Sequence, residues 1–378
     1  MTRKTIEGSI AVAEVVKNCN PGVVACYPIT PSTHIAETLN KYYADGELRS
    51  YIAVESEFSA MSALVGGSAA GERTFTVTSS QGLALMHEVL FMASGARLPI
   101  VAVVANRALS APLSIFNDHQ DSISERDSGW IQLYCESIQE SVDAVPQAYK
   151  TAEEIKLPVI ICMDGFYLTH SVEQVDIPDK DLIDEYLPKY KPEIKLDPGN
   201  PISIGTYAMP DNYQSFREDL EKDMIMAKDI LKKNCDEYQK LTKRFLSNGL
   251  FEEYKCSDAE YLLIAMGSIV GNIKIVVDSL REKGGKVGVL RIKSFRPFPK
   301  EVRKILENKK SIGVFEKNIS PGGANALYAE ILNSLYDSNK KPVVSGFIGG
   351  LGQKDISLDN IKEMFEIVMS GKKTIKFI

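Results

Sequence analysis

Three side chains of the sequence, Thr30, Glu57 and Arg107, have functional groups that could together bind a small carboxylic acid and act on it. A guanidinium beside a hydroxyl suits a planar carboxylate, because arginine can donate two parallel hydrogen bonds to it. A nearby glutamate could carry a proton. The run Ser-Ser-Gln-Gly (79–82) adds further polar groups at a point where an apolar run gives way to a helical pattern.

The segment CYPITPSTHIAETL (26–39) passes from an apolar run through a Thr-Pro pair into a helical pattern. Thr30 is predicted to cap this helix and Pro31 to be its first residue, where a missing N–H costs nothing. Three residues after the cap stands Thr33 rather than Glu or Gln, so no carboxylate closes over the helix start. Free N–H groups at such an end favour a small anion, although an ordinary helix cap explains the same residues.

Glu57 and Arg107 each have two interpretations from the sequence alone. Glu57 precedes a helical segment of mostly Ser, Ala and Gly, which lets a ligand or another helix approach closely; an acid at a helix start is also favourable for the helix dipole alone. Arg107 follows an apolar run and would be costly to bury without a partner. It therefore either pairs with an internal acid or meets an anionic ligand, and the polar run 117–121 follows it closely.

The elements that must position these residues alternate between strands and helices. Short apolar runs at 23–27, 51–54, 74–78, 100–105 and 158–162 are typical of buried strands, and segments with a period near 3.6 residues separate them. This alternation predicts an α/β fold in which a parallel sheet is covered on both faces. Because ligands bind at the carboxyl ends of such strands, the polar residues are expected at one edge of the sheet.

The rest of the chain is predicted to form a connector and a second domain. Residues 1–175 form the first domain, and 176–254 are a charged connector that contains one long amphipathic helix. Residues 255–378 return to the α/β rhythm and predict a second, smaller doubly wound domain. The apolar positions of the long helix are Phe216, Leu220, Met224, Ala227, Ile230, Leu231, Tyr238, Leu241 and Phe245.

Composition is that of an ordinary globular protein and excludes several functional classes. The 378 residues are 44% hydrophobic and 25% charged, and the formal net charge of −6, with no basic cluster, argues against a nucleic-acid partner. No run approaches the roughly 18 apolar residues of a membrane span, and the N-terminal segment lacks the features of a signal peptide. The six cysteines show no C-x-x-C spacing, so neither a zinc site nor an iron–sulfur site is predicted. A cytoplasmic protein is expected.

Several segments resemble, in order and nearly without gaps over 5–175, the alpha subunits of the pyruvate:ferredoxin oxidoreductase (pyruvate synthase) family. They are CYPITPST, ESEFSAMSALVGGSAAGERTFTVTSSQGLALMHE, NRALSAPLSIFNDHQD, SERDSGWIQLY and DGFYLTH. The resemblance continues more loosely through MGS, FRPFP, FEKN, PGG and GGLGQKD between 266 and 355.

The resemblance implies a fold and a set of roles. The first domain would be similar to the pyrimidine-binding domain of thiamine-diphosphate enzymes, and the second to the C-terminal domain of transketolases. Glu57 would lie against N1′ of the aminopyrimidine, where a shared proton favours the imino tautomer that accepts the thiazolium C2 proton. Thr30 and Arg107 would hold the carboxylate of pyruvate. The positions expected to bind cofactor are Pro28, Glu57, Ser80 and Gln81.

The family reaction implies partner subunits for this chain. Pyruvate is decarboxylated, its acetyl group passes to coenzyme A, and electrons pass through iron–sulfur clusters to ferredoxin. The sequence has no GDG stretch followed by a distant Asn, the pattern that holds Mg²⁺ and diphosphate; Met163-Asp164-Gly165 is the nearest run. The diphosphate and Mg²⁺ would therefore be held by a beta subunit, and the clusters by a delta subunit, with a gamma subunit completing the complex.

Two alternatives to the pyruvate hypothesis remain. One is an alpha subunit for another 2-oxo acid, either a branched-chain 2-oxo acid or 2-oxoglutarate, although NRALSAPLSIFNDHQD is more similar to the pyruvate type. The other is a non-catalytic assembly subunit, which would be expected to lose Glu57, Thr30 or Arg107. All three are present in this chain.

Overall fold

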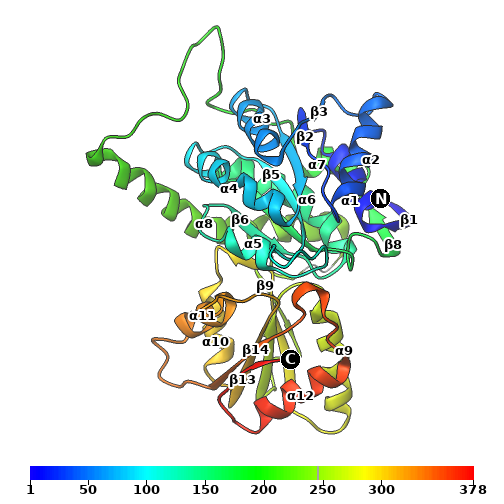
Figure 1. The fold of residues 1–378 in the computed structure, drawn as a ribbon, viewed down its shortest axis with the longest axis vertical. Helices are drawn as coiled ribbons and strands as arrows, with labels where there is room; N and C mark the ends of the chain where they lie inside the picture. Colours follow the sequence, from blue (N-terminus) through cyan, green and yellow to red (C-terminus); the bar gives the residue numbers. More distant parts are fainter. Residues whose placement is uncertain (245–246) are drawn as a thin grey trace.

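A computed structural model describes residues 1–244 and 247–378. Two α/β domains lie one above the other in Figure 1, each built around its own sheet, and the long helix α8 runs along the first domain. A separate antiparallel pair, β1 (Thr2–Glu7) and β8 (Val172–Ile177), lies at the side of the first domain. The α/β fold class expected from the sequence is confirmed.

The first sheet has seven strands, and all but one of its strand pairs are parallel. Alternation with helices places the carboxyl ends of its parallel strands at one edge. The expected strand runs overlap β2, β3, β4, β5 and β7, whereas β6 and β12 are not predicted by the sequence pattern. In order across the sheet the strands are β12 (Ser294–Arg296), β6 (Ile131–Tyr134), β7 (Val159–Asp164), β5 (Val101–Asn106), β4 (Thr74–Thr78), β2 (Val23–Cys26) and β3 (Tyr51–Ala53).

Helices cover both faces of this sheet. On one face α1 (Gly8–Asn18) packs between α2 (Thr33–Ala44) and α6 (Ile138–Ile155). On the other face lie α3 (Glu57–Ala69), α4 (Ser80–Gly95) and α5 (Gln120–Ser124). The central strands β4, β5, β6 and β7 are buried along their whole length, as expected of a sheet covered on both sides.

The start of α2 differs from the prediction. Thr30 and Pro31 lie in a turn before the helix, and the residue at the N-cap is Ser32. The turn is closed by the backbone N–H and the hydroxyl of Ser32, which both donate to the carbonyl of Ile29, at 2.8 and 2.7 Å. Because this turn uses Ile29 to Ser32, the helix begins two residues later than predicted, and Thr30 is not its cap.

The connector forms the helix α7 (Lys180–Tyr186) and the 33-residue helix α8 (Pro210–Thr242), which confirms one long helix. α8 packs on α6, and its second half has buried Ala227, Leu231 and Tyr238, whereas Phe216 near its start is 53% exposed. In Figure 1 the first turns of α8 and the chain just before them stand away from the first domain. Phe245, predicted to continue the apolar face, lies outside the described residues.

The second sheet has six strands and is parallel except where β9 pairs with β11. Helices α9 (Ile269–Glu282) and α12 (Leu358–Met369) cover one face, and α11 (Ala326–Ser334) covers the other, beside the short η1 (Lys300–Val302) and α10 (Arg303–Leu306). A further short turn, η2 (Leu351–Gln353), follows strand β14 along the chain. The strands of this sheet have a fixed order in space. That order is β15 (Ile375–Phe377), β14 (Val343–Ile348), β13 (Ser311–Glu316), β10 (Tyr261–Ala265), β11 (Val287–Ile292) and β9 (Phe251–Tyr254).

The two domains share strands as well as contacts. β9 lies in the segment expected to be a connector yet belongs to the second sheet, and β12 follows β11 directly yet joins the first sheet as its edge strand. The division of the chain at 175 and 254 therefore remains a proposal about domains. Each sheet contains one strand from beyond the boundary at 254.

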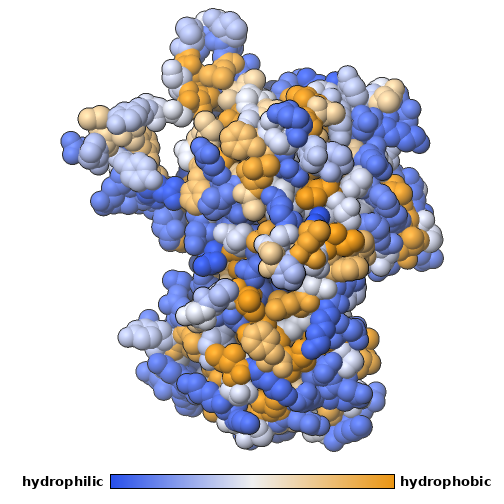
Figure 2. Space-filling view, viewed as in Figure 1, coloured by the Kyte–Doolittle hydropathy of each residue, from blue (hydrophilic) through white to orange (hydrophobic). Residues whose placement is uncertain are grey.

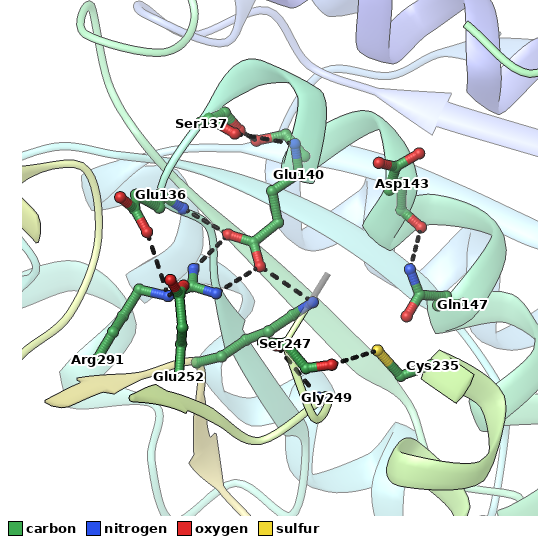
Figure 3. Close-up of polar contacts among 12 residues, drawn as sticks. Glu136, Ser137, Glu140, Asp143, Gln147, Cys235, Ser247, Gly249, Glu252 and Arg291 are labelled. Carbon is green, nitrogen blue, oxygen red and sulfur yellow. Dashed lines mark hydrogen bonds and ion pairs between the residues drawn. The ribbon is translucent and has the colours of Figure 1, made fainter. Parts of the chain in front are cut away.

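A buried cluster of charges also joins the domains (Figure 3). Arg291 on β11 is bonded to both carboxylate oxygens of Glu140, at the start of α6, and contacts Glu136 and Glu252. Burial opposes ionisation of Glu140, but Arg291 and Lys293 hold its pKa well below the usual value. Glu140 is therefore ionised, with Arg291 and Lys293 as its partners, as a buried carboxylate requires.

The six cysteines are all buried and unpaired with one another. Cys26 and Cys162 lie in the core of the first domain. Burial raises the pKa of the Cys26 thiol to about 11, so this thiol stays protonated at neutral pH.

Among the helices of the described residues, none has the length and hydropathy needed to cross a membrane.

Candidate functional site

The predicted polar residues meet at the carboxyl edge of the first sheet, and a chain of contacts connects them. Glu57 lies against the start of α4, and the backbone of Ser80 in that helix shares the carboxylate of Asp121 with the backbone of Arg107. The Arg107 side chain then reaches the carbonyl of Thr30. Four separate segments of the sequence therefore build one site.

Glu57 is the first residue of α3 and is only 6% exposed. Its carboxylate lies so close to Gly82 in α4 that a methyl group added there would come within 2.5 Å of Oε1, and within 2.5 Å of Thr78 Oγ1. Among the described residues no donor forms a hydrogen bond with the Glu57 carboxylate. The cap of α3 is instead Ser56, which accepts from the N–H of Ser59. A buried carboxylate without a partner needs one from a ligand or another chain.

Arg107 is a buried cation whose partners are backbone carbonyls. It is 7% exposed, and it donates from Nη1 to Thr30 O at 2.9 Å and from Nε to Ser114 O at 3.1 Å. Within the residues that the structure describes, it forms no ion pair, and its Nη2 has no hydrogen-bond partner. Burial lowers the pKa of Arg107, with the charge of Asp121 opposing this shift. Of the two interpretations of Arg107, this geometry favours the anionic ligand.

Thr30 and Pro28 lie on the exposed loop that follows β2. Thr30 takes part in the site through its backbone carbonyl, which orients Arg107, and its hydroxyl makes no hydrogen bond within the described parts of the chain. Thr30 therefore contacts the guanidinium through its backbone and has a hydroxyl that could bind a ligand. Pro28 lies two residues before it and presents an exposed ring.

Ser80 and Gln81 are the first residues of α4, and their side chains bond within the protein. The Ser80 hydroxyl is buried and donates to the carbonyl of Ala108, and Gln81 Nε2 donates to Ser110 Oγ. These bonds tie the start of α4 to the loop after Arg107. Ser80 also has a positive φ of 49°, so the backbone turns sharply where the strand gives way to the helix.

Asp121 connects the site and was not distinguished by sequence reasoning from its polar neighbours. Its oxygens accept from the N–H groups of Ser80 at 3.0 Å and Arg107 at 2.9 Å, and from the amide of Asn106 at 2.8 Å. Burial raises the pKa of Asp121 to about 7, and these donors oppose the shift. Periodicity could not single it out, because its partners lie 14 to 41 residues away in the sequence.

Replacing Asp121 with asparagine should loosen both segments that it holds. The N–H groups of Ser80 and Arg107 share Oδ2, and the amide of Asn106 and the N–H of Ser122 share Oδ1. The single oxygen of asparagine would therefore leave one of these pairs facing an NH₂ donor, at a cost of about 1–3 kcal/mol. We expect faster amide hydrogen exchange at Ser80 and Arg107 in the assembled complex. Asp359→Asn, at an exposed site paired with Lys362, is the control. Unchanged exchange at both amides would contradict the connecting role of Asp121.

The residues present fit an aminopyrimidine ring bound next to Glu57. The unpartnered carboxylate could share a proton with a ring nitrogen, and the hydroxyls of Thr78 and Ser79 near the end of β4 are buried without hydrogen-bond partners in the described structure. These are the groups that a polar heterocycle would satisfy. No set of three or more His, Cys, Asp or Glu side chains in the described ranges is arranged to hold a metal ion.

Apolar side chains surround this edge and remain exposed. On the loops and helix starts that form the site, Tyr27 is 39% exposed, Phe58 40%, Leu113 73% and Phe116 47%. Figure 2 shows further apolar surface over α3 and α4 on the same domain. Exposed apolar residues that border a polar site are typical of a surface covered by another protein.

Two protein-family descriptions match this chain. Residues 14–235 match "Pyruvate flavodoxin/ferredoxin oxidoreductase, thiamine diP-bdg". Residues 259–361 match "Pyruvate:ferredoxin oxidoreductase core domain II".

Relatives cover almost the whole chain. It is 48% identical to pyruvate synthase subunit PorA of Methanothermobacter thermautotrophicus over 100% of this chain and 98% of that protein. It is 51% identical to PorA of Methanocaldococcus jannaschii over 97% and 94% of the two chains. Ketoisovalerate oxidoreductase subunit VorA of Pyrococcus horikoshii is 42% identical over 98% and 95%.

Solved structures show the same fold at low sequence identity. A 2-oxoglutarate:ferredoxin oxidoreductase from Magnetococcus marinus has a TM-score of 0.74 and 19% identity, and the match covers 98% of this chain and 65% of that one. A split-gene transketolase has a TM-score of 0.57 and 12% identity, with 98% and 100% covered.

Proposed function

The chain belongs to the pyruvate flavodoxin/ferredoxin oxidoreductase family, and from this premise we propose that its site binds pyruvate through Arg107 and Thr30 beside thiamine diphosphate. The chain is an oxidoreductase subunit of the pyruvate synthase type. The complex oxidises pyruvate to acetyl-CoA and CO₂, in a reversible reaction that passes electrons to ferredoxin.

One observation supports the substrate site above the others. Arg107 is a buried guanidinium that is held by two carbonyls, has no carboxylate partner in the described structure, and keeps Nη2 unbonded. A carboxylate that meets this nitrogen and the Thr30 hydroxyl would gain a charge-assisted hydrogen bond at a site with little water. Pyruvate supplies such a carboxylate next to the keto carbon that reacts.

Glu57 is proposed as the proton carrier of the site. Thiamine diphosphate, when bound, supplies the carbanion at the thiazolium C2 that adds to 2-oxo acids. The role of Glu57 is to share a proton with N1′ of the aminopyrimidine. Two features support this role. Burial restricts the orientation of the carboxylate, and the lack of a hydrogen-bond partner in the described structure leaves its oxygens available. Pro28, Ser80 and Gln81 are proposed to shape the wall on which the ring rests.

Partner subunits are proposed to complete the cofactor site and the electron path. A beta subunit would hold Mg²⁺ and the diphosphate, and it would cover the exposed apolar side chains around the site, among them Leu113 and Phe116. A delta subunit would carry the iron–sulfur clusters, a gamma subunit would complete the complex, and coenzyme A would bind largely through these partners. We place the complex in the cytoplasm.

The isolated chain is expected to show no turnover and no visible absorption. The sequence contains neither the diphosphate–Mg²⁺ pattern nor clustered cysteines. Expression of this chain alone, followed by a visible spectrum and a dye-reduction assay with pyruvate, tests the division of labour. The complex purified from the native host is the control. Pyruvate oxidation by the chain alone would contradict the shared site.

The substrate is tested by assaying the native complex with pyruvate, 2-oxoisovalerate and 2-oxoglutarate. We expect the highest kcat/KM with pyruvate, because the PorA relatives of two methanogens are 48% and 51% identical and the VorA relative 42%. The loop 109–116 borders Arg107 and is the place where larger acyl groups would be admitted. A preference for 2-oxoisovalerate would contradict the pyruvate assignment while leaving the carboxylate site intact.

A further inference from the structure

The loop after Arg107 is held by the second domain. Residues 117–121 lie between the carboxyl edge of the first sheet and two loops of the second domain, one after β13 and one after β14. The contacts include both backbone and side-chain groups. His119 N–H donates to Lys317 O at 2.8 Å, Ile319 N–H donates to the Gln120 side chain at 3.0 Å, and Gly352 N–H donates to the Asp118 carboxylate at 3.1 Å.

Lys317 is the centre of this contact. It is 4% exposed, and its ammonium donates to Asp164 Oδ2 at 2.8 Å and to the Asn117 side-chain oxygen at 3.2 Å. Asp164, at the end of β7, also accepts from His119 Nε2 at 2.6 Å. Burial opposes ionisation of Asp164, but Lys317 and His119 hold its pKa well below the usual value. One lysine of the second domain therefore fixes both Asn117 and the strand end beside it.

The held segment is connected at short range to Arg107. Asn117 Nδ2 donates to the carbonyl of Asn106, the residue before Arg107, at 3.2 Å. At the other end, Asp121 accepts from the Arg107 N–H. The intervening loop closes on itself, since Ala108 N–H donates to Phe116 O at 2.9 Å. That loop also carries Ser114, whose carbonyl holds the Arg107 side chain. Displacing Asn117 would therefore displace the groups that aim the guanidinium.

We propose that Lys317 is a positioning residue for substrate binding: by holding Asn117 and Asp164 it fixes the loop that aims Arg107. This inference rests on the proposed function, in which Arg107 holds the carboxylate of pyruvate. It assigns the second domain a part in substrate binding as well as in assembly. Gln353 supports the same loop from η2, since its N–H donates to Asn117 O at 2.6 Å and its side chain accepts from Asn117 N–H at 3.4 Å.

A matched lysine lies at the other contact between the domains. Lys293 is 2% exposed, and its ammonium lies 3.1 Å from the buried Glu140 carboxylate of the first domain. When its lysine is removed, Glu140 keeps a second partner, Arg291, just as Asp164 keeps His119. In the part of the chain that the structure describes, no hydrogen bond or ion pair joins Lys293 or Arg291 to residues 117–121. Lys293→Met therefore removes a buried ion pair between the domains without touching the loop.

The experiment compares Lys317→Met, Lys293→Met, Arg107→Ala and the double variant Lys317→Met/Arg107→Ala. Each is purified as the complete complex, and dye reduction is measured against pyruvate and against coenzyme A. Lys317→Met should raise KM for pyruvate about tenfold or more, because a small misplacement of a binding group is costly. The KM for coenzyme A should stay unchanged, and Lys293→Met should leave both values near wild type.

The double variant separates this inference from the proposed function. If Lys317 acts through Arg107, Lys317→Met should add little in the Arg107→Ala background, because coupled residues are not additive. Three outcomes would each overturn the inference. The first is a full additional tenfold rise in KM for pyruvate when Lys317→Met is added to Arg107→Ala. The second is an unchanged KM for pyruvate in Lys317→Met, and the third is an equal rise in Lys293→Met. An Arg107→Ala complex with normal KM for pyruvate would overturn the proposed function, and this inference with it.

A second variant covers the case in which Lys317→Met does not assemble. Gln353 has a positive φ of 65°, which asparagine tolerates better than most residues. The shorter side chain of Gln353→Asn would lose the bond from the Asn117 N–H, while the backbone bond to Asn117 O would remain. The same selective rise in KM for pyruvate is expected. If the Lys317→Met complex does not assemble, an unchanged KM for pyruvate in the assembled Gln353→Asn complex overturns the inference.

Discussion

Replacing Glu57 with glutamine is expected to lower turnover of the assembled complex by about 10²–10⁴-fold, the usual cost of removing a general acid–base group. The amide has nearly the same size, so it would fit beside Gly82, where the carboxylate now lies. It cannot exchange a proton with a ring nitrogen. We therefore expect assembly to be preserved and the exchange of the cofactor C2 proton to slow in parallel with turnover.

Glu55→Gln is the matched control, because Glu55 lies two residues earlier and is exposed at the surface. It bonds only to the hydroxyl of Ser59 in the described structure, and its loss should leave the rate unchanged. The measurement is C2 proton exchange in the purified complex, together with steady-state dye reduction. Near-normal exchange in Glu57→Gln would show that Glu57 is not the proton carrier.

Replacing Arg107 with alanine is expected to lower kcat/KM for pyruvate by about 30-fold to several thousand-fold. Loss of a charge-assisted pair at a desolvated site costs roughly 2–5 kcal/mol, and each 1.36 kcal/mol is tenfold in rate. Thr30→Val should cost less, about 1–2 kcal/mol, because a neutral hydroxyl contributes a weaker bond. The valine also keeps the backbone carbonyl that holds Arg107.

The comparison uses both variants as complexes saturated with cofactor. Arg49→Ala is the control, since Arg49 is an exposed arginine paired with Glu72 at 2.8 Å. Assembly should survive in all three, because the groups at the site face the edge of the sheet rather than the core. If Arg107→Ala left KM and kcat for pyruvate unchanged, or only dissociated the complex, Arg107 would be a structural residue and the carboxylate site would be wrong.

Much of the fold follows from local pattern. The strands β2, β3, β4, β5 and β7 are continuous apolar runs between turns, and such runs predict buried parallel strands well. β6 was not predicted because its four residues include the polar Gln132, whose amide is buried and donates to Ser122 O. β1 and β8 were not predicted because each is a short, largely polar strand whose partner lies about 170 residues away in the sequence.

The residues proposed for the site were singled out from the sequence, whereas their geometry was only partly predicted. The strand ends located Glu57, Arg107 and the start of α4, because parallel strands share one carboxyl edge. The role of Thr30 as a helix cap was wrong, since Ser32 closes a turn first, and this depends on bonds that the residue pattern does not specify. The hold of Lys317 on Asn117 joins positions 200 residues apart, and no local periodicity predicts such a contact.

The strand β12 has a consequence for how the chain is made. Its pairing with β6 means that the first sheet takes its seventh strand from residues 294–296, which are synthesised after β9, β10 and β11 of the second sheet. On the ribosome, the amino-terminal domain can collapse early, yet β6 remains an open edge until residue 296 has emerged. An open edge invites pairing with other chains. Truncation before this strand would therefore release a nascent protein prone to aggregation, and the two halves of the chain mature together.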